Sequence, residues 1–340
     1  LVATVSGRIS GAASLIRESA QNNLVSDPTA ESILNHTNSA NDYTLGTIIR
    51  SGILRIPNDA VLGAAGAPIT FDIDNFSEGP PALVTTTDCE IARPITLADT
   101  GSLRAEPATT ARYTSEITGP AGLDIGFNIW TGAVALEAAN TYAGPTRVRA
   151  GTLIAANTTG SATGTGAVTV ESGATLAGDG VIAGAVTVNA GATLSPGESA
   201  GVLTIGGLAL NPAASVRIEL GGLAPGESDR ITITGPSNVA LDGDLTLEFL
   251  PGYTPTNGDE FIILSATSVT GAFATESLPD GVQIEYTPTQ VIARAVAVSQ
   301  PCPTDFNADG ATNGADLGQL HGSWGPRAGP TDLTNDGATN

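Results

Sequence analysis

Two neighbouring stretches of the chain have nearly the same sequence. Residues 166–178 read GAVTVESGATLAG and residues 184–197 read GAVTVNAGATLSPG, so the pattern recurs after 18 residues. This period is too short for a domain and fits one coil of a parallel β-solenoid, where each repeat buries its apolar side by stacking on the next. Both copies place apolar residues at strand spacing and a glycine at a corner: Val168, Val170, Gly173, Ala174 and Leu176, then Val186, Val188, Gly191, Ala192 and Leu194.

The composition agrees with a β-rich chain that has many turns. The 340 residues include 42 glycines and 21 prolines, and 41% are hydrophobic, which indicates a folded rather than a disordered protein. Only 4% are aromatic, so small aliphatic residues and threonine must fill the core. We therefore expect an all-β fold, a right-handed parallel β-solenoid (β-helix).

The charge balance limits the partners of such a chain. Thirteen basic residues, all arginine, stand against 34 acidic ones, which gives a net charge of −21. An acidic surface repels nucleic acid and anionic lipid and attracts cations. No apolar run reaches 18 residues, so we expect no transmembrane span. The first residues contain no charged-then-apolar leader, and we interpret the chain as a mature or trimmed one.

A second and more diverged repeat has a spacing of 99 residues. Residues 41–54 read NDYTLGTIIRSGIL and residues 140–153 read NTYAGPTRVRAGTL, aligned without a gap. The shared Asn, Tyr, Thr, Arg, Gly and Leu predict a tight turn, a short strand, a glycine corner and another strand. The Tyr is expected to close over a neighbouring coil, and the Asn side chain to hydrogen-bond a turn backbone.

The downstream copy carries a family resemblance. Residues 134–153, VALEAANTYAGPTRVRAGTL, resemble the autotransporter-associated β-strand repeat of bacterial passenger domains, and the similarity continues through SDRITITG at 228–235 and GDEFIIL at 258–264. We expect no β-barrel translocator to follow, which would make the chain more similar to large secreted surface proteins that carry such repeats without a barrel. The resemblance implies a secreted, extracellular protein of a bacterial cell surface or matrix.

We expect four segments along the chain. They are solenoid repeats over 1–239, a C-terminal cap of the solenoid over 240–298, a linker over 299–304 and a small α segment over 305–340. The cap is expected because solenoid ends expose strand edges that need cover. A helix or irregular insert is expected within 14–35. Cys89 and Cys302 are either two free thiols or one disulfide.

The chain from residue 305 has the spacing of a calcium-binding loop. Oxygen side chains occupy positions 1, 3, 5, 9 and 12, with glycine at position 6 for the sharp turn and a backbone carbonyl at position 7. The predicted Ca²⁺ ligands are Asp305, Asn307, Asp309, the carbonyl of Ala311, Asn313 and Asp316. The alternative is an acidic, Asn- and Gly-rich turn that binds nothing.

A second copy of this loop begins 27 residues later and reaches position 9. Its predicted ligands are Asp332, Thr334, Asp336, the carbonyl of Ala338 and Asn340. The repeated loop, with Asp at position 12 of its first copy, resembles the EF-hand-like dockerin, a calcium-dependent module that docks on a cohesin partner. The resemblance implies that Ca²⁺ binding and folding are coupled in residues 305–340.

A catalytic site is not expected. The chain has two histidines, His36 and His321, and we expect no nucleophile elbow and no zinc helix. Two acidic pairs, Asp72/Asp74 and Asp242/Asp244, have two equally good interpretations. They are either paired carboxylates of a glycosidase type or solvent-facing residues at corners.

The main functional hypothesis is a structural or adhesive surface protein. It would form filaments by self-association, head-to-tail or lateral, or dock on a cohesin-like protein, and it could bind glycans. The alternative is a polysaccharide-binding or polysaccharide-degrading β-helix protein recruited by its dockerin-like tail. Convergence of three or more carboxylates and arginines on one solenoid face would favour that alternative.

Overall fold

The computed structural model describes residues 2–18, 33–73, 80–236, 238–296 and 315. The chain divides into two compact units, Leu1–Ala295 and Val296–Asn340. The fold described below is that of the first unit. The predicted linker and the predicted dockerin-like segment lie outside the described residues, except for Ala315, so those boundaries and the expected α segment stay predictions.

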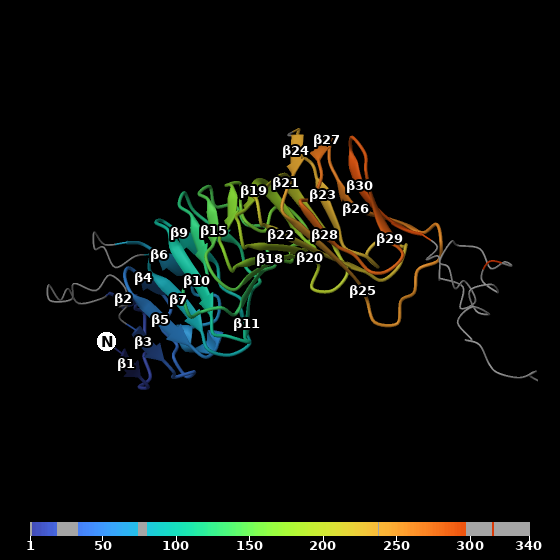
Figure 1. Cartoon of the computed structure of the whole chain (residues 1–340). Helices are drawn as coiled ribbons and strands as arrows, with labels where there is room; N and C mark the ends of the chain where they lie inside the picture. Colours follow the sequence, from blue (N-terminus) through green and yellow to red (C-terminus); the bar gives the residue numbers. More distant parts are fainter. Residues whose placement is uncertain (1, 19–32, 74–79, 237, 297–314, 316–340) are drawn as a thin grey trace, which may run out of the picture. The chain divides into compact units, whose positions relative to one another are not determined.

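The described strands of the first unit form four sheets (Figure 1). The 14-stranded sheet runs in the order β1 (Val2–Val5), β3 (Ile33–His36), β5 (Ile53–Ile56), β7 (Ala82–Thr85), β10 (Gly101–Ala105), β13 (Leu123–Ile125), β15 (Thr146–Val148), β17 (Val168–Val170), β19 (Val181–Val188), β21 (Val202–Leu210), β23 (Arg230–Ile233), β26 (Glu260–Ser265), β30 (Gln290–Ala295) and β29 (Val282–Tyr286).

The 9-stranded sheet runs in the order β28 (Thr275–Ser277), β25 (Asp244–Phe249), β22 (Ser215–Leu220), β20 (Thr193–Pro196), β18 (Thr175–Gly178), β16 (Thr152–Ala155), β14 (Ala133–Leu136), β11 (Thr110–Tyr113) and β8 (Cys89–Ile91). The 5-stranded sheet comprises β12 (Ile117–Thr118), β9 (Ile95–Leu97), β6 (Ile69–Phe71), β4 (Thr47–Ile49) and β2 (Leu15–Arg17). A 2-stranded sheet pairs β24 (Asn238–Leu241) with β27 (Ser268–Gly271), and a 3₁₀ helix, η1, spans Asp59–Leu62.

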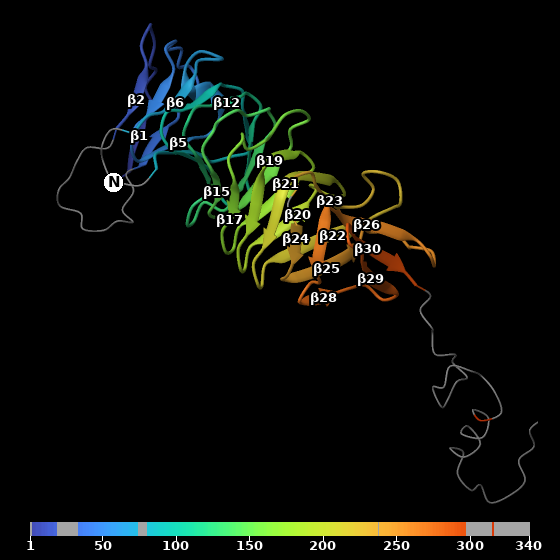
Figure 2. The same ribbon diagram turned by 90° about the horizontal axis from the view of Figure 1, so that it is seen from above.

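Neighbouring parallel strands within each sheet come from successive passes of the chain. Figure 2 shows β15, β17, β19 and β21 following one another in this way. Among the described strands, the antiparallel pairs are β26–β30 and β29–β30, and the other ladders are parallel. The prediction of an all-β chain built from parallel strands is therefore confirmed, and the arrangement is compatible with a β-solenoid.

The 18-residue repeat forms adjacent strands in register. Val168 pairs with Val186 in β17 and β19, and Thr175 pairs with Thr193 in β18 and β20. The eight apolar residues predicted to face inward are at most 1% exposed. Gly173 and Gly191 have φ angles of 79° and 75°, and the Gly173 amide donates to the Gly191 carbonyl over 2.8 Å. Because this left-handed conformation favours glycine, the predicted corners follow from the sequence.

The 99-residue repeat also forms the same local structure twice. The Tyr43 hydroxyl lies 2.7 Å from Thr47 Oγ1, and the Tyr142 hydroxyl lies 2.6 Å from Thr146 Oγ1. A short strand, a left-handed glycine corner and a second strand follow in both copies, as expected. The first copy links the 5-stranded sheet to the 14-stranded sheet, whereas the second links the 14-stranded sheet to the 9-stranded one. The local motif therefore specifies a corner but not which faces meet there.

The two asparagines of this repeat tie successive passes together. Asn140 Oδ1 accepts from the Ile117 amide over 2.7 Å, and its Nδ2 donates to the Ala162 carbonyl over 2.6 Å. Asn41 makes the same pair of bonds, to the Ile9 amide and the Val61 carbonyl. The expected side-chain bond to turn backbone is confirmed, and it joins three passes of the chain.

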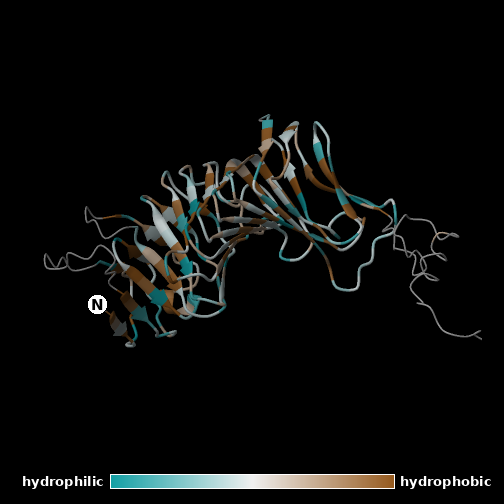
Figure 3. Ribbon diagram, viewed as in Figure 1, coloured by the Kyte–Doolittle hydropathy of each residue, from teal (hydrophilic) through white to brown (hydrophobic). Residues whose placement is uncertain are grey.

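Apolar residues alternate along the strands and meet in one elongated core (Figure 3). The core extends from Ile49 to Ala293 and consists mainly of valine, leucine and isoleucine. The prediction of a helix or irregular insert within 14–35 is wrong for the residues of this range that the structure describes. Leu15–Arg17 and Ile33–His36 are strands, because their aliphatic residues pair with β4, β1 and β5. Residues 19–32 lie outside the described part.

Candidate functional site

The predicted calcium ligands cannot be placed in the structure. Asp305, Asn307, Asp309, Ala311, Asn313 and Asp316 of the first loop lie outside the described residues, as do Asp332, Thr334, Asp336, Ala338 and Asn340 of the second. Cys302 also lies outside, so its pairing with Cys89 stays open. Within the described ranges no group of three or more His, Cys, Asp or Glu side chains could hold a metal ion.

The structure instead brings polar residues together in a groove on the outer face of the 9-stranded sheet. The groove has a volume of about 500 Å³. Its floor comprises Thr152, Ile154, Thr175, Ala177 and Ser195, its arch comprises residues 196–199, and its far wall comprises Arg217 and Glu219. We call this site the outer groove. β18, β20 and β22, which carry much of it, lie side by side in Figure 1.

The floor of the outer groove forms because side chains alternate between the two faces of each strand. In β16, β18 and β20 the inward positions are buried leucines, so the residues on either side of each leucine face outward. Thr152, Thr175 and Thr193 lie in register across the three strands, and Ile154, Ala177 and Ser195 form the next outward row. The small side chains of Ala177 and Ser195 in that second row leave the space that forms the groove.

The arch of the outer groove depends on a glycine turn. Gly197 has a φ angle of 79°, and a Cβ there would lie 1.8 Å from the Ser199 carbonyl oxygen. Gly178 and Gly197 donate to each other's carbonyls over 3.0 and 2.8 Å. These bonds fold the loop after β20 back toward β18, so residues 196–199 lean over the floor.

A buried carboxylate anchors the arch from behind. Asp229 is 1% exposed; its Oδ1 accepts from the Gly201 amide and its Oδ2 from the Glu219 amide, each over 2.9 Å. Burial raises the pKa of Asp229 to about 7, and the two backbone amides oppose that rise. Its two bonds join Gly201, two residues after the arch, to Glu219 of β22.

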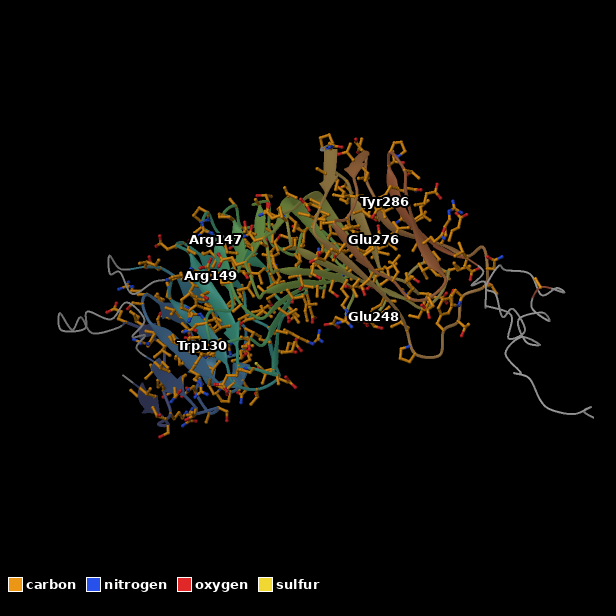
Figure 4. The ribbon with its side chains drawn as sticks, in the orientation of Figure 1. Trp130, Arg147, Arg149, Glu248, Glu276 and Tyr286 are labelled. Carbon is orange, nitrogen blue, oxygen red and sulfur yellow. The ribbon has the colours of Figure 1, made fainter. Side chains whose placement is uncertain are left out.

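Ion pairs frame the outer groove at both ends. Arg112 lies 2.9 Å from Glu137 and 3.5 Å from Glu198, although Glu198 is 86 residues further along the chain. Arg217 lies 2.7 Å from Glu248, which Figure 4 labels near β25. The hydrogen bond that Arg112 donates to Glu137 is the main reason that the pKa of Arg112 is raised. Arginines and carboxylates therefore do converge on one face.

One expectation about motifs is wrong. Residues 197–201 read GESAG and match the G-x-S-x-G pattern of a nucleophile elbow. That elbow requires a strand followed by a helix and a histidine base, whereas Ser199 lies between β20 and β21, and no histidine is among the residues lining the groove. Among the residues that line the groove, Ser199 therefore has no histidine to activate it as a nucleophile. The GESAG pattern could have been found in the sequence.

A second cluster stacks guanidinium groups on aromatic rings. The Arg104 guanidinium lies 5.0 Å from the ring centroids of both Phe127 and Trp130, and that of Arg149 lies 4.9 Å from Phe127. Arg149 also pairs with Asp124 over 3.0 Å. Figure 4 shows Trp130 and Arg149 on the N-terminal half of the unit. Because the Arg104 side chain is 2% exposed and the rings cover both guanidinium groups, the cluster is best explained by packing.

A second cavity of about 500 Å³ lies beside Cys89. Its buried cation, Arg93, donates to Asp59 Oδ1 and to the carbonyls of Gly63 and Ala64 over 2.7 to 3.0 Å. Burial, followed by nearby Asp59 and Asp88, raises the pKa of the Cys89 thiol to about 11. The thiol therefore stays protonated near neutral pH, which disfavours a nucleophilic role.

The remaining sequence candidates have structural partners. His36 is fully buried, with Nε2 2.8 Å from Asn41 Nδ2, and burial lowers its pKa. Asp242 Oδ1 accepts from the Gly243 amide, and Asp244 accepts from the Thr275 hydroxyl. Asp72 lies 3.7 Å from Arg50, while Asp74 and His321 lie outside the described residues.

Comparison with known proteins gives no family. No protein-family model matches the chain, and no curated protein matches it. The described residues contain no helix that is long and apolar enough to cross a membrane.

Proposed function

We propose that this chain is a secreted structural or adhesive protein of a bacterial surface or extracellular matrix. Its first unit, which we call the body, would be a right-handed parallel β-solenoid that serves as a stiff, extended scaffold. The parallel ladder from β1 to β26 over one continuous core is the observation that carries this proposal. The antiparallel strands β29 and β30 would act as the solenoid cap expected within 240–298.

The tail is proposed to bind Ca²⁺ and to provide attachment. Its predicted donors are all oxygens, which are the ligands that Ca²⁺ prefers. With Ca²⁺ bound, residues 305–340 would fold into an EF-hand-like, dockerin-like module. That module would dock on a cohesin-like protein or on another copy of the chain, and repeated head-to-tail contacts would produce a filament. Catalysis is not part of the proposal.

Calorimetric titration of the whole chain with Ca²⁺ tests the tail. Saturable binding is expected in the wild type and in Asp280→Ala, an exposed aspartate of the body. Asp305→Ala and Asp309→Ala should each weaken binding at least about tenfold, because each removes a direct ligand. Equal binding by all four proteins would overturn the calcium proposal.

A second function is favoured by the outer groove. There Arg112, Arg217, Glu198 and Glu219 approach one face of the 9-stranded sheet. This convergence supports a polysaccharide-binding protein, or a polysaccharide-degrading one, recruited by its tail. Release of reducing ends from a polysaccharide panel separates the two, since a binding protein releases none.

A further inference from the structure

We propose that the outer groove binds a strand of neutral polysaccharide laid across β16, β18 and β20. This inference deepens the second function above. It is independent of the calcium-binding tail, because none of the residues that line the groove belongs to residues 296–340.

The first argument is a row of available hydroxyl groups. Thr152, Thr175 and Thr193 occupy the same outward position in three successive parallel strands. Parallel strands are separated by about 4.8 Å, so these hydroxyls recur at that spacing. Thr152 and Thr175 line the groove, and Thr193 continues the row beside it; among the described residues none of the three hydroxyls has a hydrogen-bond partner. A polymer lying perpendicular to the strands would meet one donor and acceptor per strand.

The second argument is the mixed character of the floor and arch. Ala177, with the edge of the largely buried Ile154, gives a small aliphatic patch beside the hydroxyl groups of Ser195 and Ser199. A sugar ring has hydroxyl groups at its edge and C–H bonds on its faces, so it can use both kinds of surface. A purely apolar ligand would leave the hydroxyls unpaired, which costs free energy.

The third argument is charge. Arg112 is already paired with Glu137 and Glu198, and Arg217 with Glu248, so neither guanidinium is offered to an anion. Glu219 adds a further carboxylate to the wall, and the chain as a whole has a net charge of −21. This field repels polymers of uronic acids or sulfated sugars. The acidic field therefore excludes polyanions, and the floor, which carries no charged side chain to hold a cationic sugar, fits a neutral chain.

Calorimetry with three soluble hexasaccharides tests the inference. The probes are a β-1,4-linked glucose hexamer, a galacturonate hexamer and a glucosamine hexamer, added at equal concentrations to the full chain. The glucose hexamer is expected to bind, and the galacturonate hexamer is not. Absence of glucose-hexamer binding at millimolar concentration would overturn the proposal, as would binding of either charged hexamer alone.

Three variants locate the binding. Thr175→Val removes one hydroxyl at constant shape and should weaken glucose-hexamer binding about fivefold, the value of one hydrogen bond. Ala177→Arg places a long side chain in the groove and should weaken binding by more than about tenfold, even if Thr175→Val folds poorly. Thr169→Val makes the same change as Thr175→Val on the 14-stranded sheet and should bind like the wild type. An equal loss in Thr169→Val would contradict the assigned site.

Discussion

Val168 of β17 lies directly beside Val186 of β19, the residue at the same place in the next copy of the repeat. Both side chains are fully buried. A slip of β19 by one residue would turn Val186 to the outer face, so the register is fixed by burial as well as by backbone hydrogen bonds. The 18-residue period is therefore the length of one pass of the chain in this region.

The tyrosines give a prediction with an internal control. Tyr142→Phe removes the hydroxyl that pairs with the buried Thr146 and should cost about 1 kcal/mol in the free energy of unfolding. Tyr113 is equally buried, but its hydroxyl has no partner among the described residues. Tyr113→Phe should therefore be neutral or stabilising. Urea denaturation of both variants checks this, and an equal loss in the two would contradict the assigned Tyr142–Thr146 bond.

The bridging asparagine should matter more than an exposed one. Asn140→Ala leaves the Ile117 amide and the Ala162 carbonyl without their partner, and we expect a loss of about 2 to 3 kcal/mol in unfolding free energy. The matched control is Asn211→Ala, which removes an exposed bond to Asn189 and should change stability by less than about 0.5 kcal/mol. Chemical denaturation measures both values. Similar values for the two variants would show that Asn140 does not tie the passes together.

Trp130, in the connection between β13 and β14, should stabilise the outer face of the N-terminal strands. Trp130 packs on Ile53, Ala82 and Val84, outside the main core. Trp130→Ala should cost about 3 kcal/mol and speed proteolysis near β5 and β7. Ile129→Ala is the control, because Ile129 is 65% exposed and should leave stability nearly unchanged. An intact proteolysis pattern in Trp130→Ala would contradict this role.

Asp229 should make stability depend on pH. Burial raises its folded-state pKa to about 7 from an ordinary value of 3.8, so the folded state binds more protons than the unfolded state between these values. Its contribution to stability is full below about pH 4 and is lost as pH rises through 7. The stability of the wild type minus that of Asp229→Asn should therefore fall from pH 4 to pH 8. A difference that rises over this range would mean that the pKa is lowered in the folded state.

The repeats predicted the local structure well because each repeat contains its own strand and corner signals. Val168, Gly173 and Leu176 specify an inward strand, a turn and another inward strand without distant help. The 99-residue repeat was equally clear locally, yet its copies link different sheets. The first copy contributes β4 to the 5-stranded sheet, whereas the second copy comes after β12, the last strand of that sheet along the chain.

The outer groove could not be read from the sequence for a related reason. Arg112 and Glu198 meet across 86 residues, because the arch folds back over neighbouring strands. One signal was nevertheless present. The two copies of the 18-residue repeat place Ala177 and Ser195 at equivalent positions, so a row of small outward residues could have been noticed beside the row of threonines.

Amide hydrogen exchange of the full chain, with Ca²⁺ and after chelation, tests the proposed division into a rigid body and a calcium-dependent tail most directly. The core amides of β11 to β25 should exchange slowly and equally in both conditions. Amides of residues 305–316 should be protected only when Ca²⁺ is present. Unchanged exchange in the tail, or loss of protection in the body on chelation, would contradict the proposal.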